Sequence, residues 1–204
     1  MRIRTVATHL LAFAVGGAIA LTIGYVRWND KSDPFEFRRW VTMNRAAFAP
    51  ADATLLFGDS IVERAYLPTL CGRPTFNAGL SSSKTVDQLP MMDDLIATTR
   101  PRWIVVSTGV NDVIKGVTLA EWKPNAKRIV AVAGAHGIIL GISSESGDVK
   151  PFNDFLRAEV RAAGGTFIEP LSVNLTNDGV HPNRRGYAEM VRSIDSACGS
   201  SGRI

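Results

Sequence analysis

Residues 54–60 read Thr-Leu-Leu-Phe-Gly-Asp-Ser, and this stretch decides the fold of the 204-residue chain. Its first four residues form a short apolar run of the length of a buried strand. Gly58-Asp59 ends the run, and residues 61–67 then carry apolar side chains in a helical pattern. A serine at such a strand-to-helix turn exposes its hydroxyl, and its backbone N–H at the helix start stabilises negative charge. Ser60 is therefore a candidate nucleophile, although serine is also a common helix N-cap.

A carboxylate and an imidazole lie three residues apart near the other end of the chain, in residues 178–183 (Asp-Gly-Val-His-Pro-Asn). On one tight turn, Asp178 reaches His181 Nδ1 and fixes the tautomer whose Nε2 faces a serine. A serine hydroxyl needs such a base because it is a poor nucleophile at its own pKa. Taken without His181, Asp178 has an equally good reading as a cap of the turn before the last helix.

Two further short segments contain candidate donors for an oxyanion. Gly79 follows a short strand-like run, and Asn111 follows a stronger one. A glycine N–H and an asparagine side-chain amide are the groups that oxyanion holes use. Asn111 has a second interpretation, because asparagine is also frequent in left-handed turns.

These four segments, in this order, resemble the blocks of the SGNH (GDSL-like) hydrolase family, which carry Ser, Gly, Asn and His. The resemblance covers about residues 53–197. It implies that Ser60 is the nucleophile, that His181 is the base and that Asp178 orients His181. It also implies an oxyanion hole made by the N–H groups of Ser60 and Gly79 and by the side chain of Asn111. The family's fold is flavodoxin-like, and its reaction needs neither a cofactor nor a metal.

The composition excludes several other functions. The net charge is +4 and the basic residues are scattered, without the aromatic residues between them that a nucleic-acid surface would show. No glycine-rich phosphate-binding motif is present, so nucleotide binding has no support. The two cysteines form no Cys-x-x-Cys pair, and no His/Cys spacing indicates zinc.

Strand-like and helical segments alternate after residue 53. We expect strands at 54–57, 75–77, 103–107, 137–142 and 166–168, and helices at 60–69, 84–98, 119–133, 149–163 and 184–197. This alternation predicts a five-stranded parallel sheet covered on both faces by helices, a three-layer α/β/α sandwich. Ligands of such sheets lie at the carboxyl ends of the strands, and all four blocks fall at that edge.

The N-terminal segment, residues 1–28, predicts a membrane or export function. Arg2 and Arg4 precede an uncharged run over residues 5–26, about long enough to cross the roughly 20-residue hydrocarbon core. We favour an uncleaved signal anchor that forms a transmembrane helix. The alternative is a signal peptide cleaved after Ala18-Ile19-Ala20, which would release a secreted protein. The apolar run continues beyond that site, which favours the anchor.

Residues 29–52 read as a linker and residues 53–204 as the hydrolase domain. An amphipathic helix is expected at 33–49, either lying at the membrane surface or packed on the domain. The basic residues after the N-terminal segment outnumber those before it, and the positive-inside rule counted on them would leave the domain in the cytoplasm. A basic start followed by an apolar run is nevertheless typical of export signals, so we expect a periplasmic or other extracytoplasmic domain.

Several polar residues near the blocks have structural interpretations. Asp59 and Asp112 are expected to brace their loops, and Ser81-Ser82-Ser83 is expected to be loop and helix cap. Cys71 and Cys198 each follow a helix, and in the family's topology both helices end at the edge away from the site. A disulfide between them, consistent with an oxidising compartment, is one hypothesis. The other is that they are two unrelated small apolar residues.

The sequence thus predicts a membrane-anchored serine esterase acting on a small-molecule, lipid or acylated-glycan ester. Loops after the strands are short, apart from residues 143–150, which favours a short acyl group such as acetyl. An acyltransferase that uses the same site on an envelope glycan is an alternative. A non-catalytic glycan- or lipid-binding module is a second alternative, against which stands the presence of all five catalytic and oxyanion groups.

Overall fold

The computed structural model describes residues 15–22 and 33–201, and the chain divides into two compact units, residues 1–36 and residues 37–204. Residues 15–22 are helical. None of the helices described is both long and apolar enough to cross a membrane. Most of the transmembrane helix predicted for residues 1–28 falls outside the described residues, so that helix stays a prediction.

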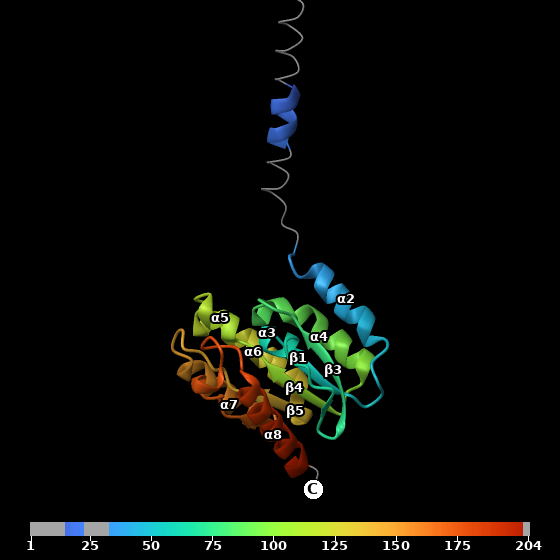
Figure 1. Ribbon diagram of the computed structural model, residues 1–204, viewed down its shortest axis with the longest axis vertical. Coiled ribbons are helices and arrows are strands. Elements are labelled where there is room, and N and C mark those ends of the chain that lie inside the picture. The colour runs from blue at the N-terminus through green and yellow to red at the C-terminus, as the bar shows by residue number, and fades with distance from the viewer. Residues whose placement is uncertain (1–14, 23–32, 202–204) are drawn as a thin grey trace, which may run out of the picture. The chain divides into compact units, whose positions relative to one another are not determined.

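The second unit is built on one sheet with the strand order β2-β3-β1-β4-β5-β6 (Figure 1). The strands are β1 (Thr54–Gly58), β2 (Thr69–Leu70), β3 (Arg73–Gly79), β4 (Trp103–Ser107), β5 (Gly137–Leu140) and β6 (Thr166–Ile168). Five of them are parallel, and β2 pairs antiparallel with β3 at one edge. Along the chain, β3 is added on one side of β1, and β4, β5 and β6 are added on the other side, which is the flavodoxin-like order. The crevice that such a switch in direction creates therefore lies between β1 and β4.

Helices cover both faces of this sheet and complete a three-layer α/β/α sandwich. They are α2 (Glu36–Ala46), α3 (Ser60–Glu63), α4 (Thr85–Thr99), α5 (Val110–Ile114), α6 (Leu119–Ala133), α7 (Lys150–Ala162) and α8 (Arg184–Ser201), with 3-10 turns η1 (Gly134–His136) and η2 (Val173–Leu175). Helices α4, α6 and α7 pack side by side against β1, β5 and β6. Helix α3 packs on β1 and β3, and α8 crosses from β2 to β6. Figure 1 shows α8 in red, near the C-terminus.

The central strands are buried on both faces, as their continuous apolar runs require. Every residue of β1, β4 and β5 is buried. Helix α6 packs against β5, and its Trp122 is the largest fully buried side chain among the described residues. The start of α6 is fixed by a capping box, in which Thr118 and Glu121 satisfy each other's backbone N–H groups.

The predicted five-stranded, wholly parallel sheet is wrong at one edge, and the predicted helix at 60–69 is wrong in its length. Helix α3 ends at Glu63 because the Asn77 side chain takes the carbonyls that a longer helix would have used. Asn77 Nδ2 donates to Val62 O at 2.7 Å and to Ala65 O at 2.9 Å. The chain then turns back and adds β2 beside β3, so the sheet has six strands and is mixed.

The hypothesis of a disulfide is confirmed: Cys71 is bonded to Cys198, with the two Cα atoms 5.5 Å apart. Cys71 directly follows β2, and Cys198 lies in α8. The bond therefore ties the last helix to the hairpin that follows the candidate nucleophile. It also closes a loop between residues 127 positions apart.

Reduction of this bond is expected to lower the free energy of unfolding by about 2–5 kcal/mol, because the cross-link restricts the unfolded chain over a long loop. Urea unfolding with and without a reductant measures the difference. The double variant Cys71→Ala/Cys198→Ala serves as the control and should match the reduced protein in both buffers. Titration of two free thiols in unreduced, exported protein would contradict the prediction.

Candidate active site

The turn between β1 and α3 leaves no room for a side chain at Gly58. Its φ is +158°, and a Cβ there would lie 1.9 Å from Ser107 O on the neighbouring strand. Asp59 follows and caps α3, because its Oδ1 accepts the N–H of Ile61 at 3.0 Å. Ser60 is consequently the first residue of α3, with its N–H at the open end of the helix.

The structure brings Ser60, His181 and Asp178 together. Ser60 Oγ lies 2.8 Å from His181 Nε2, and His181 Nδ1 lies 2.7 Å from Asp178 Oδ2. Asp178 Oδ1 also accepts the backbone N–H of His181, at 2.8 Å. These hydrogen bonds from His181 favour the charged carboxylate and lower the pKa of Asp178 to about 2. Asp178 is thus an anion at any neutral or mildly acidic pH and holds the imidazole in line with Ser60.

Two contacts that the sequence does not reveal fix the start of α8, which follows the Asp178–His181 turn. Asn183 caps the start of α8, since its Oδ1 accepts the N–H groups of Arg185 and Gly186 at 2.9 and 3.0 Å. One turn further on, Tyr187 Oη donates to Ile61 O at 2.9 Å. Because Ile61 follows Ser60 directly, this bond fixes α8 relative to the nucleophile.

Two of the three predicted oxyanion donors, Asn111 and Gly79, differ in whether their hydrogens are already used in hydrogen bonds. Asn111 lies in α5, and its Nδ2 donates one hydrogen to Ser83 O at 3.0 Å, which leaves its second hydrogen available. The Gly79 N–H donates to Asn77 Oδ1 at 2.9 Å. A Cβ at Gly79 would lie 2.2 Å from Glu63 N, so close packing of α3 on β3 already requires this glycine. For Gly79 to serve as a donor, its bond to Asn77 would have to open.

Sequence reasoning missed a special backbone position in the loop between β3 and α4. Ser82 adopts a left-handed conformation with φ +65°, which is uncommon for a residue other than glycine. Its N–H has no hydrogen-bond acceptor in the part of the chain that the structure describes, while its carbonyl accepts Lys115 Nζ at 2.6 Å. Three consecutive serines give no signal for such a conformation.

Asp112 braces the loops around the site, as predicted. Its Oδ2 accepts both the N–H and the hydroxyl of Thr85, each at 2.8 Å, which joins α5 to the start of α4. Trp122 Nε1 donates to the same Thr85 hydroxyl at 2.9 Å. Burial raises the pKa of Asp112, and the Thr85 bonds oppose that effect. Within residues 15–22 and 33–199, no group of three His, Cys, Asp or Glu side chains is placed to hold a metal.

Asp59 is also buried, and it is only partly satisfied. Its Oδ2 has no hydrogen-bond partner among the described residues. Burial, with a smaller contribution from the negative charge of Asp112, raises the pKa of Asp59 to about 7. The carboxyl group next to the candidate nucleophile therefore exchanges its proton near neutral pH, whereas Asp178 does not.

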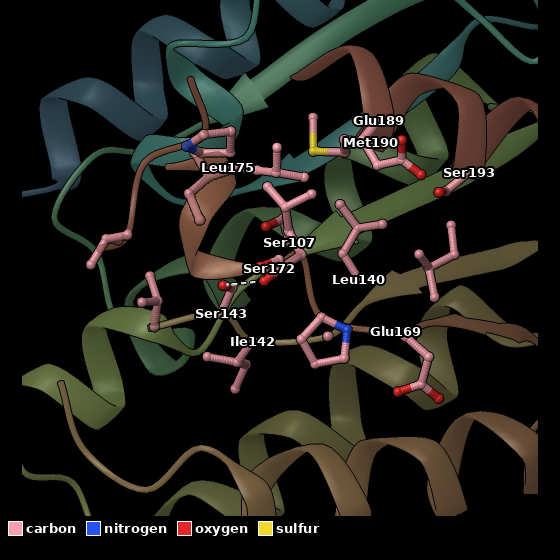
Figure 2. Close-up of a pocket in the computed structure, with 18 of the residues that line it drawn as sticks. Ser107, Leu140, Ile142, Ser143, Glu169, Ser172, Leu175, Glu189, Met190 and Ser193 are labelled. Atoms are coloured by element: carbon pink, nitrogen blue, oxygen red, sulfur yellow. Dashed lines mark hydrogen bonds between the residues drawn. The ribbon is translucent and has the colours of Figure 1, made fainter. Parts of the chain in front are cut away.

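A cavity of about 410 Å³ lies beside the Asp178–His181 turn (Figure 2). Asp59 and Ile61 line it next to α3, and Val180 lines it from the Asp178–His181 turn. Leu175 lines it from η2 and Met190 from α8. Ser60 and His181 do not belong to its lining, which is mostly apolar. The cavity therefore adjoins the residues next to Ser60 and His181 without including these two side chains.

Residues 56–189 match the GDSL-like Lipase/Acylhydrolase family, and the chain belongs to this family. It is a hydrolase that acts on esters. The expectation drawn from the four sequence blocks is thereby confirmed. The match begins two residues into β1 and ends within α8, so it leaves out α2.

Named relatives agree with this assignment. The thioesterase 1/protease 1/lysophospholipase L1 of Escherichia coli is 25% identical over 177 residues, which cover 74% of this chain and 84% of that protein. A GDSL-like lipase from Bacteroides thetaiotaomicron has a TM-score of 0.67 at 19% identity, covering 81% of this chain and 98% of its own. An acetylxylan esterase from Geobacillus stearothermophilus has a TM-score of 0.58 at 17% identity, covering 74% and 95%. The two structures share the fold with this chain.

Asp59→Asn is expected to make stability less dependent on pH. The folded-state pKa of about 7 is raised above the ordinary 3.8, so the contribution of Asp59 is fully present below about pH 4 and is lost as the pH rises through 7. Asn keeps the cap on Ile61 and carries no charge. The variant should gain stability relative to wild type at pH 8, by at most about 4 kcal/mol, since each tenfold change in the acid constant is worth about 1.4 kcal/mol.

Urea unfolding of both proteins at pH 5 and pH 8 measures this gain. Asp94→Asn, which changes an exposed carboxyl on α4, is the matched control and should shift neither curve. An equal loss of stability at both pH values in Asp59→Asn would contradict the prediction.

Proposed function

We propose that the chain is a serine esterase whose catalytic triad is Ser60, His181 and Asp178. The observation that carries the proposal is the unbroken line of hydrogen bonds from Ser60 Oγ through the imidazole to Asp178, at 2.8 and 2.7 Å. A hydroxyl becomes a useful nucleophile when a base receives its proton and a third group orients that base. The arrangement of these three side chains meets both conditions.

In the proposed acylation step, Ser60 Oγ attacks the carbonyl carbon of the ester while its proton moves to His181 Nε2. Asp178 stays ionised and stabilises the imidazolium that forms. The bond between the carbonyl carbon and the alcohol oxygen then breaks, and His181 returns the proton to the departing alcohol. The product of this step is an acyl ester on Ser60.

Water completes the cycle by attacking the acyl group on Ser60, with His181 again accepting and returning a proton. In both steps, negative charge develops on the former carbonyl oxygen. The Ser60 N–H and the second amide hydrogen of Asn111 are the donors proposed to stabilise it, with Gly79 joining them if its bond to Asn77 opens. Losing one such donor typically lowers turnover by about 10²–10³-fold.

The substrate proposed is an ester of a short acyl group such as acetyl. The proposal is supported by the cavity near the site, because Ser60 is not part of its lining and the cavity is therefore not a pocket that opens at the proposed nucleophile. The similar Geobacillus stearothermophilus protein is an acetylxylan esterase, which agrees with an acetylated glycan as substrate. The Escherichia coli relative is named a thioesterase and a lysophospholipase, so chain length has to be tested directly.

The location proposed is outside the cytoplasm, with residues 1–28 as a membrane anchor. The uncharged run at 5–26 supports the anchor, and the Cys71–Cys198 bond agrees with an oxidising compartment. On α2, Phe37 and Trp40 are 71% and 61% exposed and stack with their ring centroids 5.9 Å apart. Exposed aromatic rings of this kind are typical of surfaces at a membrane interface.

The esterase proposal is tested with residues 29–204 and the p-nitrophenyl esters of acetate, butyrate and octanoate. We expect the acetate ester to be turned over fastest and Ser60→Ala and His181→Ala each to lower kcat about 10⁴-fold or more, because both remove a member of the triad. Thr98→Ala, an exposed hydroxyl on α4, should keep the wild-type rate. Activity that survives Ser60→Ala would refute the mechanism, and a folded protein inactive on all three esters would favour the acyltransferase or the binding module.

The membrane proposal is tested by fractionating bacterial cells that express the full chain. The full chain should sediment with membranes after a carbonate wash, because about 20 apolar residues suffice to span the bilayer. Protease added to intact spheroplasts should digest the hydrolase domain, and residues 29–204 alone should stay in the soluble fraction. A full chain with an intact N-terminus in the soluble fraction would contradict the anchor, whereas a mature protein beginning near residue 21 would support the cleaved signal peptide.

A further inference from the structure

Helix α2, which lies before the part of the chain that matches the family, is bonded directly to the loop after β3. Arg38 Nη1 donates to Ser81 O at 2.9 Å, and Arg38 Nη2 pairs with Glu63 Oε1. Glu63 Oε2 in turn accepts the N–H of Ser81 at 3.1 Å and also bonds the Ser81 hydroxyl. One arginine–glutamate pair therefore holds the carbonyl, the N–H and the side chain of Ser81.

Fixing the Ser81 carbonyl also fixes the N–H of Ser82. The two groups belong to one planar trans peptide, so they point in opposite directions. Arg38 binds the carbonyl, which turns the Ser82 N–H away from α2. This N–H has no acceptor among the described residues, and the left-handed backbone of Ser82 is a conformation that needs support from its surroundings.

The same loop orients the side chain of Asn111 on its far side. Asn111 Nδ2 donates to Ser83 O, so the direction of its second hydrogen depends on where the loop places that carbonyl. Lys115 Nζ binds the intervening carbonyl of Ser82. The residues from Ser81 to Ser83 thus lie between the Arg38–Glu63 pair on one side and the proposed oxyanion donor Asn111 on the other.

We propose that Arg38 is a positioning residue for the oxyanion side of the active site. Through Ser81 it keeps the loop in the conformation that directs the Asn111 amide at the oxygen that becomes negative, and that turns the Ser82 N–H away from α2 as an additional donor for this oxygen. The inference rests on the proposed function and makes α2 part of the enzyme instead of a linker. Arg38 and Glu63 have side chains that are 36% and 40% exposed, and ion pairs this exposed contribute little to folding. The effect of losing Arg38 is therefore expected on the rate.

The test compares Arg38→Ala with wild type on p-nitrophenyl acetate. We expect kcat to fall about tenfold with KM changed less than about twofold, because a misdirected donor weakens binding of the transition state more than that of the substrate. The melting temperature should stay close to the wild-type value. Guanidinium ions at sub-denaturing concentration should restore part of kcat in this variant, and Arg38→Lys should recover less than the full rate because an ammonium lacks the forked geometry.

Arg45→Ala is the matched control, since Arg45 lies on the same helix but contacts the Phe76 ring on β3, 5.9 Å from its centroid, instead of the loop. It should keep the wild-type kcat and show no guanidinium rescue. Three results would each overturn the inference: a wild-type kcat in Arg38→Ala, an equal loss in Arg45→Ala, or a loss that tracks a fall in melting temperature.

A second measurement separates this inference from the proposed function. A fluorophosphonate labels an active serine when Ser60 Oγ bonds to phosphorus, fluoride leaves and His181 takes the proton. The phosphonyl oxygen needs the same donors, so Arg38→Ala should slow labelling of Ser60 about tenfold. Equal labelling rates in Arg38→Ala and wild type would overturn the inference while leaving the esterase proposal intact. A wild-type Ser60 that is not labelled would refute both.

Discussion

The closeness of β1 to its two neighbours is the constraint on which the active site depends. Gly58 and Gly79 lie opposite each other in the parallel register of β1 and β3. A side chain at Gly58 would collide with the carbonyl of Ser107 on β4, and one at Gly79 would collide with the backbone of Glu63 in α3. Because both residues are glycines, β1 leads directly into α3, and Ser60 lies where the order of the parallel strands reverses. A larger residue at either position would move Ser60, the proposed nucleophile, away from His181.

The rest of the site is held by contacts from three directions. The Asp178–His181 turn arrives with α8, which Tyr187 ties to Ile61 and the Cys71–Cys198 bond ties to the edge hairpin. Asp112 joins the start of α4 to α5 from within the core. Helix α2 approaches from the third direction and holds the loop after β3. Each of these contacts holds a short, irregular segment of the chain in place.

The sequence predicts well those features that depend on neighbours in the chain. The bounds of β4 and α6 agree with the predicted 103–107 and 119–133, because a buried apolar run and a helical period are both local patterns. The contact between Asp178 and His181 is equally local, since both lie on one turn. The pairing of Ser60 with His181 was predicted from the family resemblance, because no local pattern joins residues so far apart.

The features that the sequence did not reveal all depend on distant side chains. Asn77 ends α3 from 12 and 15 residues away, and this shortening makes room for β2. Asn77 Oδ1 also accepts the N–H of Gly79, so the hydrogen that was predicted to bind the oxyanion is already bonded within the chain. Arg38 binds Ser81 across 43 residues, so no reading of residues 33–49 alone connects that helix with the active site.

The hydrogen bond between Ser60 and His181 joins residues 121 positions apart, and this has a consequence for how the protein is made. During synthesis the serine emerges early, whereas its base emerges close to the C-terminus. Contacts of such long sequence separation form late in folding, because the intervening chain must be ordered first. A nascent or still unfolded chain therefore carries a serine without its base. On the proposed mechanism, the hydrolase is inactive while it is being synthesised and becomes active when its last helix packs on the sheet.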